Sequence, residues 1–317
     1  MSIRALIISE DDARGVFINR ESVKDYEKRR EDIVKEIIGK TYLRLDGIGG
    51  CTPHSNNVVF IWVEDDIVEY EVAKVVNGKV YWDEYDGNLT ASVGVFAIKE
   101  GLIKTNQLVV KHKQSGISTL LKFEGERVIE TWTESIEKVL ITKKPIDDIL
   151  VRGRYVRVSI VNSLKPIVIV RARDLEMEGY EMPDEELGEI EKLFDDMVLK
   201  LKKIIGNREP IIVTIANPRD YLTLDRREIR SIEFDLSVRE YNLRRFNETL
   251  SIASGIGLGF SSLIPNSLTN FLARPVKYLR LAHPLGVMKF EVNSKENYLE
   301  VSVERNVKIV MEGNIFI

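Results

Sequence analysis

The sequence predicts an α+β protein made of two similar β-rich domains, each wrapped around a buried central helix and related by a pseudo-twofold. Its 317 residues exceed one ordinary domain. Strands, a charged helix, an apolar helix and further strands occur in the first half, and this order recurs in the second half. Two lobes so related would direct the starts of their buried helices toward a shared cleft, and ligands favour such clefts.

Alternating apolar residues and turn signals predict the elements of the first half. A charged helix from about Ser22 to Ile38 keeps its apolar residues on one side and ends at Gly39. Asp65-Asp66 and Asn77-Gly78 separate β-rich runs, and Asn-Gly is a strong hairpin signal. The predicted strands are 4–8, 15–18, 58–63, 68–75, 79–82, 107–112, 117–123 and 127–131.

A polar segment around residues 143–148, which carries Pro145, separates the halves. We therefore expect an N-terminal lobe over residues 1–147, onto which the final strands, about 298–317, can pack back, and a C-terminal lobe over residues 148–317. The helices predicted in the second lobe are an amphipathic one from Asp184 to Ile205 and an apolar one from Phe246 to Ser262. Its predicted strands are 156–161, 166–172, 210–216, 287–292, 298–303 and 314–317.

Composition argues against several functional classes. The formal net charge of −4 lacks the positive excess of a nucleic-acid-binding protein. One cysteine and three scattered histidines offer no intramolecular disulfide and no close set of metal ligands, so we expect no metal. The apolar run from Ile252 to Ile264 is shorter than the roughly 20 residues that span a bilayer. The N-terminus has no signal-peptide pattern, so we expect a cytoplasmic protein without membrane contact.

The most informative segment is the start of the apolar helix in the first half, where Asp86-Gly87-Asn88 precedes residues 89–101. Asp86 or Asn88 can cap this helix, and Gly87 allows close backbone approach. The unpaired first-turn N–H groups carry roughly half a positive charge, so a carboxylate substrate would fit there. Asn and Asp also begin many ordinary helices, and a plain capping role stays open.

Several stretches, in order along nearly the whole chain, resemble the PrpF-like family, the 2-methylaconitate isomerases and their relatives with the diaminopimelate-epimerase fold. Residues 46–50, Asp-Gly-Ile-Gly-Gly, resemble its glycine-rich turn, and residues 86–102 are similar to its Cys-Gly-Asn helix. Residues 283–288 resemble its His-Pro-Ser-Gly turn, and residues 305–313 its basic segment before the last strand. Residues 14–17, Arg-Gly-Val-Phe, are similar to an N-terminal Lys-Gly-Val-Phe.

The resemblance implies a cleft for a small unsaturated di- or tricarboxylate and proton transfer without a cofactor, in which one group removes a proton and another returns it. Two positions depart from the family pattern. Asp86 stands where the family has the thiol of Cys-Gly-Asn, and Asn57 stands where it has the lysine of Ser-Lys. A carboxylate with an ordinary pKa of about 3.9 is a weak base for a carbon acid, and Asn57 cannot titrate at all.

The candidate site residues are of two kinds. Asp86 is the first catalytic candidate, Cys51 could replace the missing thiol, and His54 could supply the titratable group lost at Asn57. A lone cysteine is also a common buried hydrophobe, and a loop histidine is often solvated. The binding candidates offer N–H groups, amides or positive charge to a carboxylate: Arg14, Gly49, Gly50, Asn57, Gly87, Asn88, His283 and Gly286. Ordinary turns, caps and solvated side chains remain the alternatives, as they do for Arg305 and Lys308.

We therefore predict an isomerase or tautomerase that shifts a double bond in an aconitate-like or methylaconitate-like acid. Two alternatives stay open. The replaced cysteine and lysine fit a family member that binds a carboxylate without turnover, and the fold also suits an epimerase or racemase, which would need two opposed acid/base groups. The expected partner is the small carboxylate, and the sequence leaves open whether two subunits form a homodimer.

Overall fold

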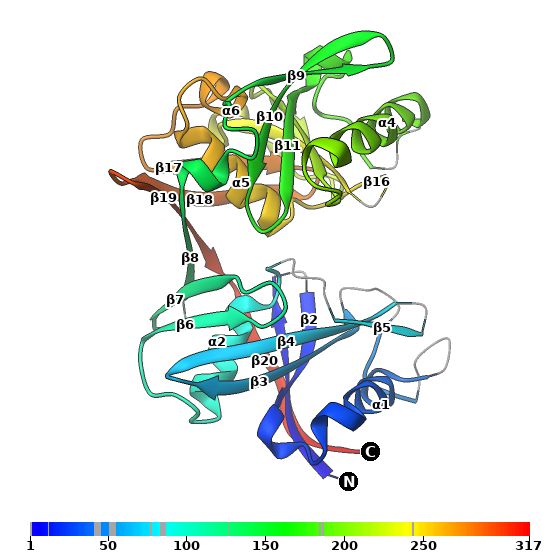
Figure 1. The fold of residues 1–317 in the computed structure, drawn as a ribbon, viewed down its shortest axis with the longest axis vertical. Coiled ribbons are helices and arrows are strands. Elements are labelled where there is room, and N and C mark those ends of the chain that lie inside the picture. Colours follow the sequence, from blue (N-terminus) through cyan, green and yellow to red (C-terminus); the bar gives the residue numbers. More distant parts are fainter. Residues whose placement is uncertain are drawn as a thin grey trace. The chain divides into compact units, whose positions relative to one another are not determined.

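The computed structural model describes the chain except for residues 1, 12, 41–45, 51–54, 77, 83–86, 126, 184, 186 and 243. It divides into two compact units, the first made of Met1–Thr131 and Glu304–Ile317 and the second of Trp132–Val303. The chain passes between them through β8 (Arg127–Ser135) and β19 (Tyr298–Arg305), as Figure 1 shows. The first unit gives way to the second within β8, a continuous nine-residue strand with residues in both units. This crossing comes before the domain boundary predicted at residue 147.

In the first unit, strands surround α2 (Thr90–Lys99), as Figure 1 shows. The other long helix, α1 (Tyr26–Ile38), is amphipathic. β1 pairs antiparallel with both β2 and β20, and β2 runs parallel to β3. In β1, Ile3, Ala5 and Ile7 belong to the apolar cluster that holds α1, whereas Glu10 reaches α2. The other strands of this unit are β1 (Ser2–Glu10), β2 (Ala13–Asn19), β3 (Asn57–Glu64), β4 (Ile67–Val76), β5 (Lys79–Tyr81), β6 (Gln107–His112), β7 (Ser118–Glu124) and β20 (Val307–Phe316).

The second unit repeats this plan around α5 (Ile252–Leu263), of which every residue except Leu263 is buried. α4 (Gly188–Ile204) is amphipathic and buries Leu193, Phe194, Met197 and Leu201. The short helices are α3 (Ile136–Val139) and α6 (Leu268–Leu272). The strands are β9 (Asp147–Val151), β10 (Arg154–Asn162), β11 (Pro166–Arg171), β12 (Ile211–Ala216), β13 (Tyr221–Leu222), β14 (Glu228–Ile229), β15 (Leu236–Asn242), β16 (Arg245–Phe246), β17 (Tyr278–His283) and β18 (Gly286–Ser294).

The predicted α+β class, with a buried helix in each half, is confirmed. Several boundaries differ from the prediction. α5 begins at Ile252 rather than Phe246, because Arg245 and Phe246 form β16 and Ser251 caps the helix. β9, β15 and β17 were not predicted as strands, and β20 begins well before residue 314.

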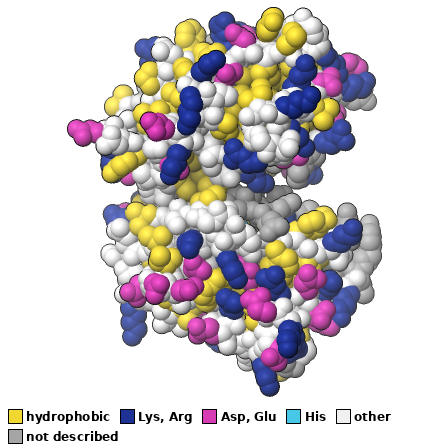
Figure 2. All heavy atoms as spheres, viewed as in Figure 1, with side chains coloured by type: hydrophobic (Ala, Val, Ile, Leu, Met, Phe, Trp, Pro, Cys, Tyr) yellow, Lys and Arg dark blue, Asp and Glu magenta, His cyan; other side chains and the backbone are white. Residues whose placement is uncertain are grey.

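The charges on the surface and the length and apolarity of the helices agree with what the composition predicts. On the face drawn in Figure 2, basic and acidic side chains are interspersed across the first unit, as expected for nearly balanced charges. Within the described part of the chain, no helix has the length and apolarity needed to cross a membrane.

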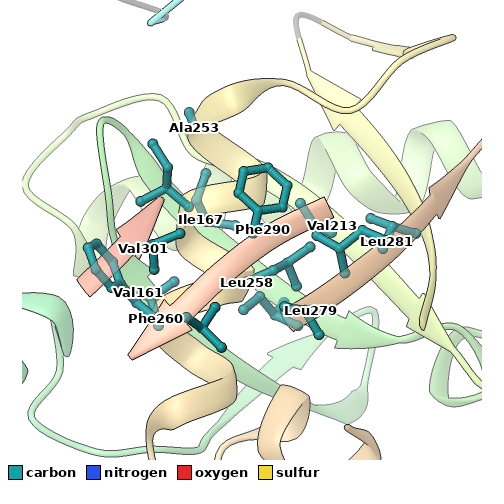
Figure 3. Packing of buried hydrophobic residues seen from close by; sticks show 14 of the residues in the cluster. Val161, Ile167, Val213, Ala253, Leu258, Phe260, Leu279, Leu281, Phe290 and Val301 are labelled. Atoms are coloured by element: carbon teal, nitrogen blue, oxygen red, sulfur yellow. The ribbon is translucent and has the colours of Figure 1, made fainter. Parts of the chain in front are cut away.

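Small residues let α5 fit inside its sheet. Figure 3 shows Leu258 and Phe260 of this helix among side chains that include Val161, Phe290 and Val301. A β-carbon at Gly259 would lie 2.9 Å from both methyl groups of Val301. The glycine therefore allows an approach between helix and strand that a larger residue would prevent.

We expect Gly259→Ala to lower the free energy of unfolding by about 1–3 kcal/mol, because the added methyl group overpacks against the stiff Val301 side chain. Urea unfolding followed by circular dichroism measures the change. The matched control is Gly188→Ala in α4, where a β-carbon would meet nothing within 4 Å. A Gly259→Ala protein as stable as the wild type would show that this packing is not tight.

Candidate functional site

The glycine-rich turn at residues 46–50 is fastened to the first unit by its own N–H groups. Ile48 and Gly49 donate to Ile37 O and Ile38 O, at the end of α1, with N···O distances of 2.7 and 2.9 Å. Gly50 N donates to Asn56 Oδ1 at 2.8 Å. From the sequence we expected Gly49 and Gly50 to donate their N–H groups to a ligand. In the structure both N–H groups already donate to acceptors within the protein.

Arg14 lies beside this turn. A β-carbon at Gly50 would be 3.7 Å from Arg14 Nη2, so the guanidinium lies near the turn backbone. Asn57, only 6% exposed, donates from Nδ2 to Arg14 O at 3.0 Å. Arg14 is half-buried, and no acidic side chain among the described residues forms an ion pair with it.

The start of α2 lies next to Gly15. Gly15 pairs with Asn57 across the parallel strands β2 and β3. A β-carbon at Gly15 would be 3.2 Å from Leu89 Cδ1 and 3.5 Å from Asn57 O. Leu89 is the N-cap residue of α2. The structure thus brings Arg14, Gly50 and Asn57 together, and we call these three residues the Arg14 region. The neighbouring Gly15 faces the start of α2 instead.

The cap of α2 differs from the prediction. Leu89 holds the N-cap position without a side-chain hydrogen bond, and Asn88 precedes it. A buried carboxylate caps the helix instead, because Glu10 Oε2 accepts from Ser92 N at 2.7 Å. Part of the anion site expected at this helix start is therefore filled by the protein's own acid.

Arg305 forms ion pairs with Glu10 and with two further carboxylates, Glu130 and Asp11. Its Nη2 lies 2.9 Å from Glu10 Oε1, its Nη1 lies 3.2 Å from Glu130 Oε2, and its Nε lies 2.7 Å from Asp11 Oδ2. Arg305, Glu10 and Glu130 are buried, so the pairs are shielded from solvent. The sequence left open that Arg305 neutralises a tricarboxylate ligand. In the structure it instead neutralises carboxylate side chains of the first unit.

Burial changes the acidity of this cluster. It raises the pKa of Glu10 to about 7, although Arg305 and the Ser92 N–H favour the ionised form. Burial also raises the pKa of Glu130 well above its ordinary value, again against the attraction of Arg305. One guanidinium faces three carboxyl groups, and two of them, Glu10 and Glu130, have a raised pKa.

The start of α5 in the second unit uses the same chemistry. Ser251 is the N-cap and accepts from Ser254 N. Buried Glu240 Oε2 accepts from Ser251 N at 3.0 Å and from Ser251 Oγ at 2.7 Å, and Asn247 Nδ2 donates to Oε1 at 2.6 Å. Burial raises the pKa of Glu240. Sequence reasoning missed this residue, and its only signal is an acidic side chain inside an apolar strand.

The His283 turn also belongs to the second unit. His283 ends β17, Gly286 begins β18, and His283 is 8% exposed. Leu285 N donates to His283 Nδ1 at 3.3 Å. Gly286 has a φ of 151°, a backbone conformation that favours glycine. The turn is therefore a compact hairpin with a mostly buried imidazole.

The remaining predicted residues are placed only in part. Gly87 is buried with a φ of 79°, and Asn88 is half-buried, both just before α2. The three catalytic candidates, Asp86, Cys51 and His54, lie outside the described residues. Among the residues that are described, no group of three or more His, Cys, Asp or Glu side chains is arranged to hold a metal ion.

Known proteins of one family match this chain over nearly its whole length. The family model described as PrpF protein matches residues 1–130 and 121–317. A 3-methylitaconate isomerase from Eubacterium barkeri is 24% identical over 370 residues, covering 100% of this chain and 97% of that protein. A 2-methyl-aconitate isomerase from Shewanella oneidensis is 21% identical over 383 residues, covering 95% of this chain and 93% of that protein.

A solved structure gives the same result for the fold. The crystal structure of a methylitaconate-delta-isomerase matches with a TM-score of 0.88 at 21% identity, covering 99% of this chain and 95% of that one. Racemase and epimerase structures share the fold more distantly. The predicted diaminopimelate-epimerase-like fold is confirmed.

We expect the stability difference between Glu10→Gln and the wild type to depend on pH. The folded protein holds the Glu10 proton up to about pH 7, whereas the unfolded chain releases it near its ordinary value of 4.5. The folded state therefore binds more protons between these values, and the wild type loses stability as pH rises through that window. Glutamine cannot ionise, so the variant escapes this loss.

Urea unfolding at pH 5 and pH 8 measures the effect. The free energy of unfolding of Glu10→Gln minus that of the wild type should increase with pH, by an amount on the order of 2 kcal/mol. The control is Glu312→Gln on the exposed strand β20, whose difference from the wild type should stay constant. A Glu10→Gln difference that is constant or decreasing with pH would contradict the assignment.

Proposed function

The chain belongs to the PrpF protein family, and from this membership we propose that it shifts a double bond in a small unsaturated di- or tricarboxylate by proton transfer without a cofactor. The observation that carries the proposal is the match to named isomerases along nearly the full length of both partners. The proposed substrates are acids of the methylitaconate, methylaconitate and aconitate type. The proposed site lies between the two lobes.

The Arg14 region supports binding of a carboxylate. The half-buried guanidinium has no acidic partner among the described side chains and lies near Gly50. Charge-assisted hydrogen bonds from an arginine to a carboxylate are short and can be bidentate. Asn57 holds the Arg14 backbone through its amide and so fixes where this side chain begins.

Proton transfer needs one group that accepts a proton from carbon and one that returns it. We propose Asp86, directly before buried Gly87, as one of these groups, with His54 and Cys51 as candidates for the other. Asn57 provides no proton, because an amide does not titrate. On the second lobe we propose that His283 and Gly286 contact the substrate.

A second candidate function is ligand binding without turnover. The observation that favours it is Asn57, which stands at the family's lysine position and is buried with its amide bonded to Arg14 O. A protein with this arrangement keeps a carboxylate site while lacking one acid/base group. Solvent-isotope exchange and ligand-induced stabilisation distinguish the two functions.

We expect the purified protein in deuterium oxide to incorporate deuterium into at least one of 3-methylitaconate, 2-methylaconitate, aconitate or oxalomesaconate, because the carbon acid exchanges its proton with the catalytic group. Proton NMR follows the loss of the C–H signals. Asp86→Ala should abolish the exchange. The control, Asp148→Ala in the second unit, removes an exposed carboxylate and should leave the exchange unchanged.

A thermal-shift series with the same acids completes this test. Stabilisation by an acid that shows no deuterium uptake would support the binding function and contradict the isomerase. Neither stabilisation nor uptake with any acid would contradict both functions.

We expect Arg14→Gln to weaken binding of the active acid by about 10–100-fold, because a hydrogen bond to a charged group contributes about 1.5–3 kcal/mol. The measurement is KM, or Kd by calorimetry if turnover is absent. Arg127→Gln is the control, since Arg127 belongs to the same unit but is exposed and lies near Glu304. Equal binding by Arg14→Gln and the wild type would remove Arg14 from the proposed site.

A further inference from the structure

Three arginines come into question as partners of a substrate carboxylate, and two of them are neutralised within the protein. Arg305 faces three carboxyl groups of the first unit. Arg227, which donates to the His283 turn, also donates from Nε to Asp225 Oδ2 at 2.8 Å. Arg14, in contrast, is half-buried and has no acidic partner among the described side chains. Of these three arginines, Arg14 is therefore the one suited to a substrate carboxylate.

Asn57 adds no charge to the Arg14 region. It takes the place of the family's lysine in the resemblance described above, and an amide does not ionise. Its Nδ2 donates to Arg14 O at 3.0 Å. One guanidinium pairs with one carboxylate. Each further carboxylate of a substrate therefore meets no side-chain cation within the Arg14 region.

The His283 turn presents an apolar side chain at its surface. Leu285 is half-buried, while the other three residues of the turn are buried. Val287 and Met288, which follow the turn, pack against two apolar clusters of the second unit, and Leu285 belongs to neither cluster. Leu285 is therefore the residue through which this turn can meet a ligand.

The backbone of Leu285 is held on both sides. Its N–H donates to His283 Nδ1 at 3.3 Å, and its carbonyl accepts from Arg227 Nη2 at 2.6 Å. Tyr221 Oη lies 2.9 Å from His283 O and 3.0 Å from Gly286 O, so one hydroxyl closes the turn. The leucine side chain thus starts from a fixed backbone, as a residue that selects between ligands requires.

A leucine at this position favours an alkyl group over a carboxylate. In the resemblance to His-Pro-Ser-Gly, Leu285 takes the place of the serine. A serine hydroxyl can donate a hydrogen bond to a carboxylate, whereas a leucine side chain has no polar atom. A carboxylate placed against leucine loses hydration without a compensating hydrogen bond. An alkyl group at the same place gains from leaving water.

We propose that the substrate is an unsaturated dicarboxylate that carries an alkyl group, with one carboxylate bound by Arg14 and the alkyl group in contact with Leu285. This inference rests on the proposed function, which puts the substrate between the two lobes and so lets it meet residues of both. A third carboxylate would find neither a further cation in the Arg14 region nor a hydrogen-bond donor on the Leu285 side chain.

Four acids separate the effect of charge from that of the alkyl group. Itaconate and 3-methylitaconate have two carboxylates, aconitate and 2-methylaconitate have three, and the second acid of each pair carries a methyl group. The measurement is kcat/KM, or Kd by calorimetry if turnover is absent. We expect the wild type to prefer each dicarboxylate to the matching tricarboxylate by about 10–100-fold. It should prefer each methylated acid by about three- to fivefold, the gain from burying one methyl group.

Two substitutions test the role of Leu285. Leu285→Ser should bring the ratio between methylated and unmethylated acids close to one, because the apolar contact is lost. Leu285→Lys should reduce the preference for dicarboxylates about tenfold, because it adds a cation to the turn. The matched controls are Leu199→Ser and Leu199→Lys in α4, where the side chain is 64% exposed. Both controls should leave the two ratios unchanged.

A wild type that prefers tricarboxylates, or a Leu285→Ser protein that keeps the methyl preference, would overturn this proposal and leave the proposed function standing. A wild type that neither binds nor converts any of the four acids would overturn both. The wild-type comparison needs no substitution, so it decides the proposal even if a Leu285 variant does not fold.

Discussion

Two buried helix starts set the constraint on which this structure depends. The first N–H groups of a helix lack partners within it, and an unpaired buried group costs about 1–3 kcal/mol. The chain supplies its own carboxylates, Glu10 at α2 and Glu240 at α5. Each buried carboxylate then needs partners of its own. Glu10 forms an ion pair with Arg305, and Glu240 accepts from the Ser251 hydroxyl.

This solution decides how the first unit can attract a ligand. The N–H groups of Gly49, Gly50 and Ser92 are committed to acceptors within the protein. In the proposed site, the positive charge toward a carboxylate then comes from a side chain, Arg14. In the second unit the His283 turn is likewise held by side-chain donors from residues 221–227. Both regions are thus rigid supports for a few polar groups.

Apolar runs with small residues predicted both buried helices, because only a buried helix is apolar on all sides. The same patterns missed β15, since Arg239 and Glu240 interrupt it and both of its faces are buried. Capping was misjudged at α2 because the true partners are distant along the chain: Glu10 and Ser92 are 82 residues apart. No local pattern identifies such a pair. Of the candidate site, the structure places Arg14 near Gly50 and Asn57, whereas the roles of these residues and of Asp86, Cys51 and His54 stay predictions.

The pairing of β1 with β20 has a consequence for biosynthesis. Ser2 lies opposite Phe316 in this antiparallel ladder, and the guanidinium that neutralises Glu10 comes from residue 305. The first unit therefore cannot complete its sheet or its buried ion pairs while the ribosome is still making the second. Trp132–Val303, in contrast, draws its whole core from one continuous stretch of chain. The half that is translated first therefore keeps an open strand edge on β1 until β20 has been made.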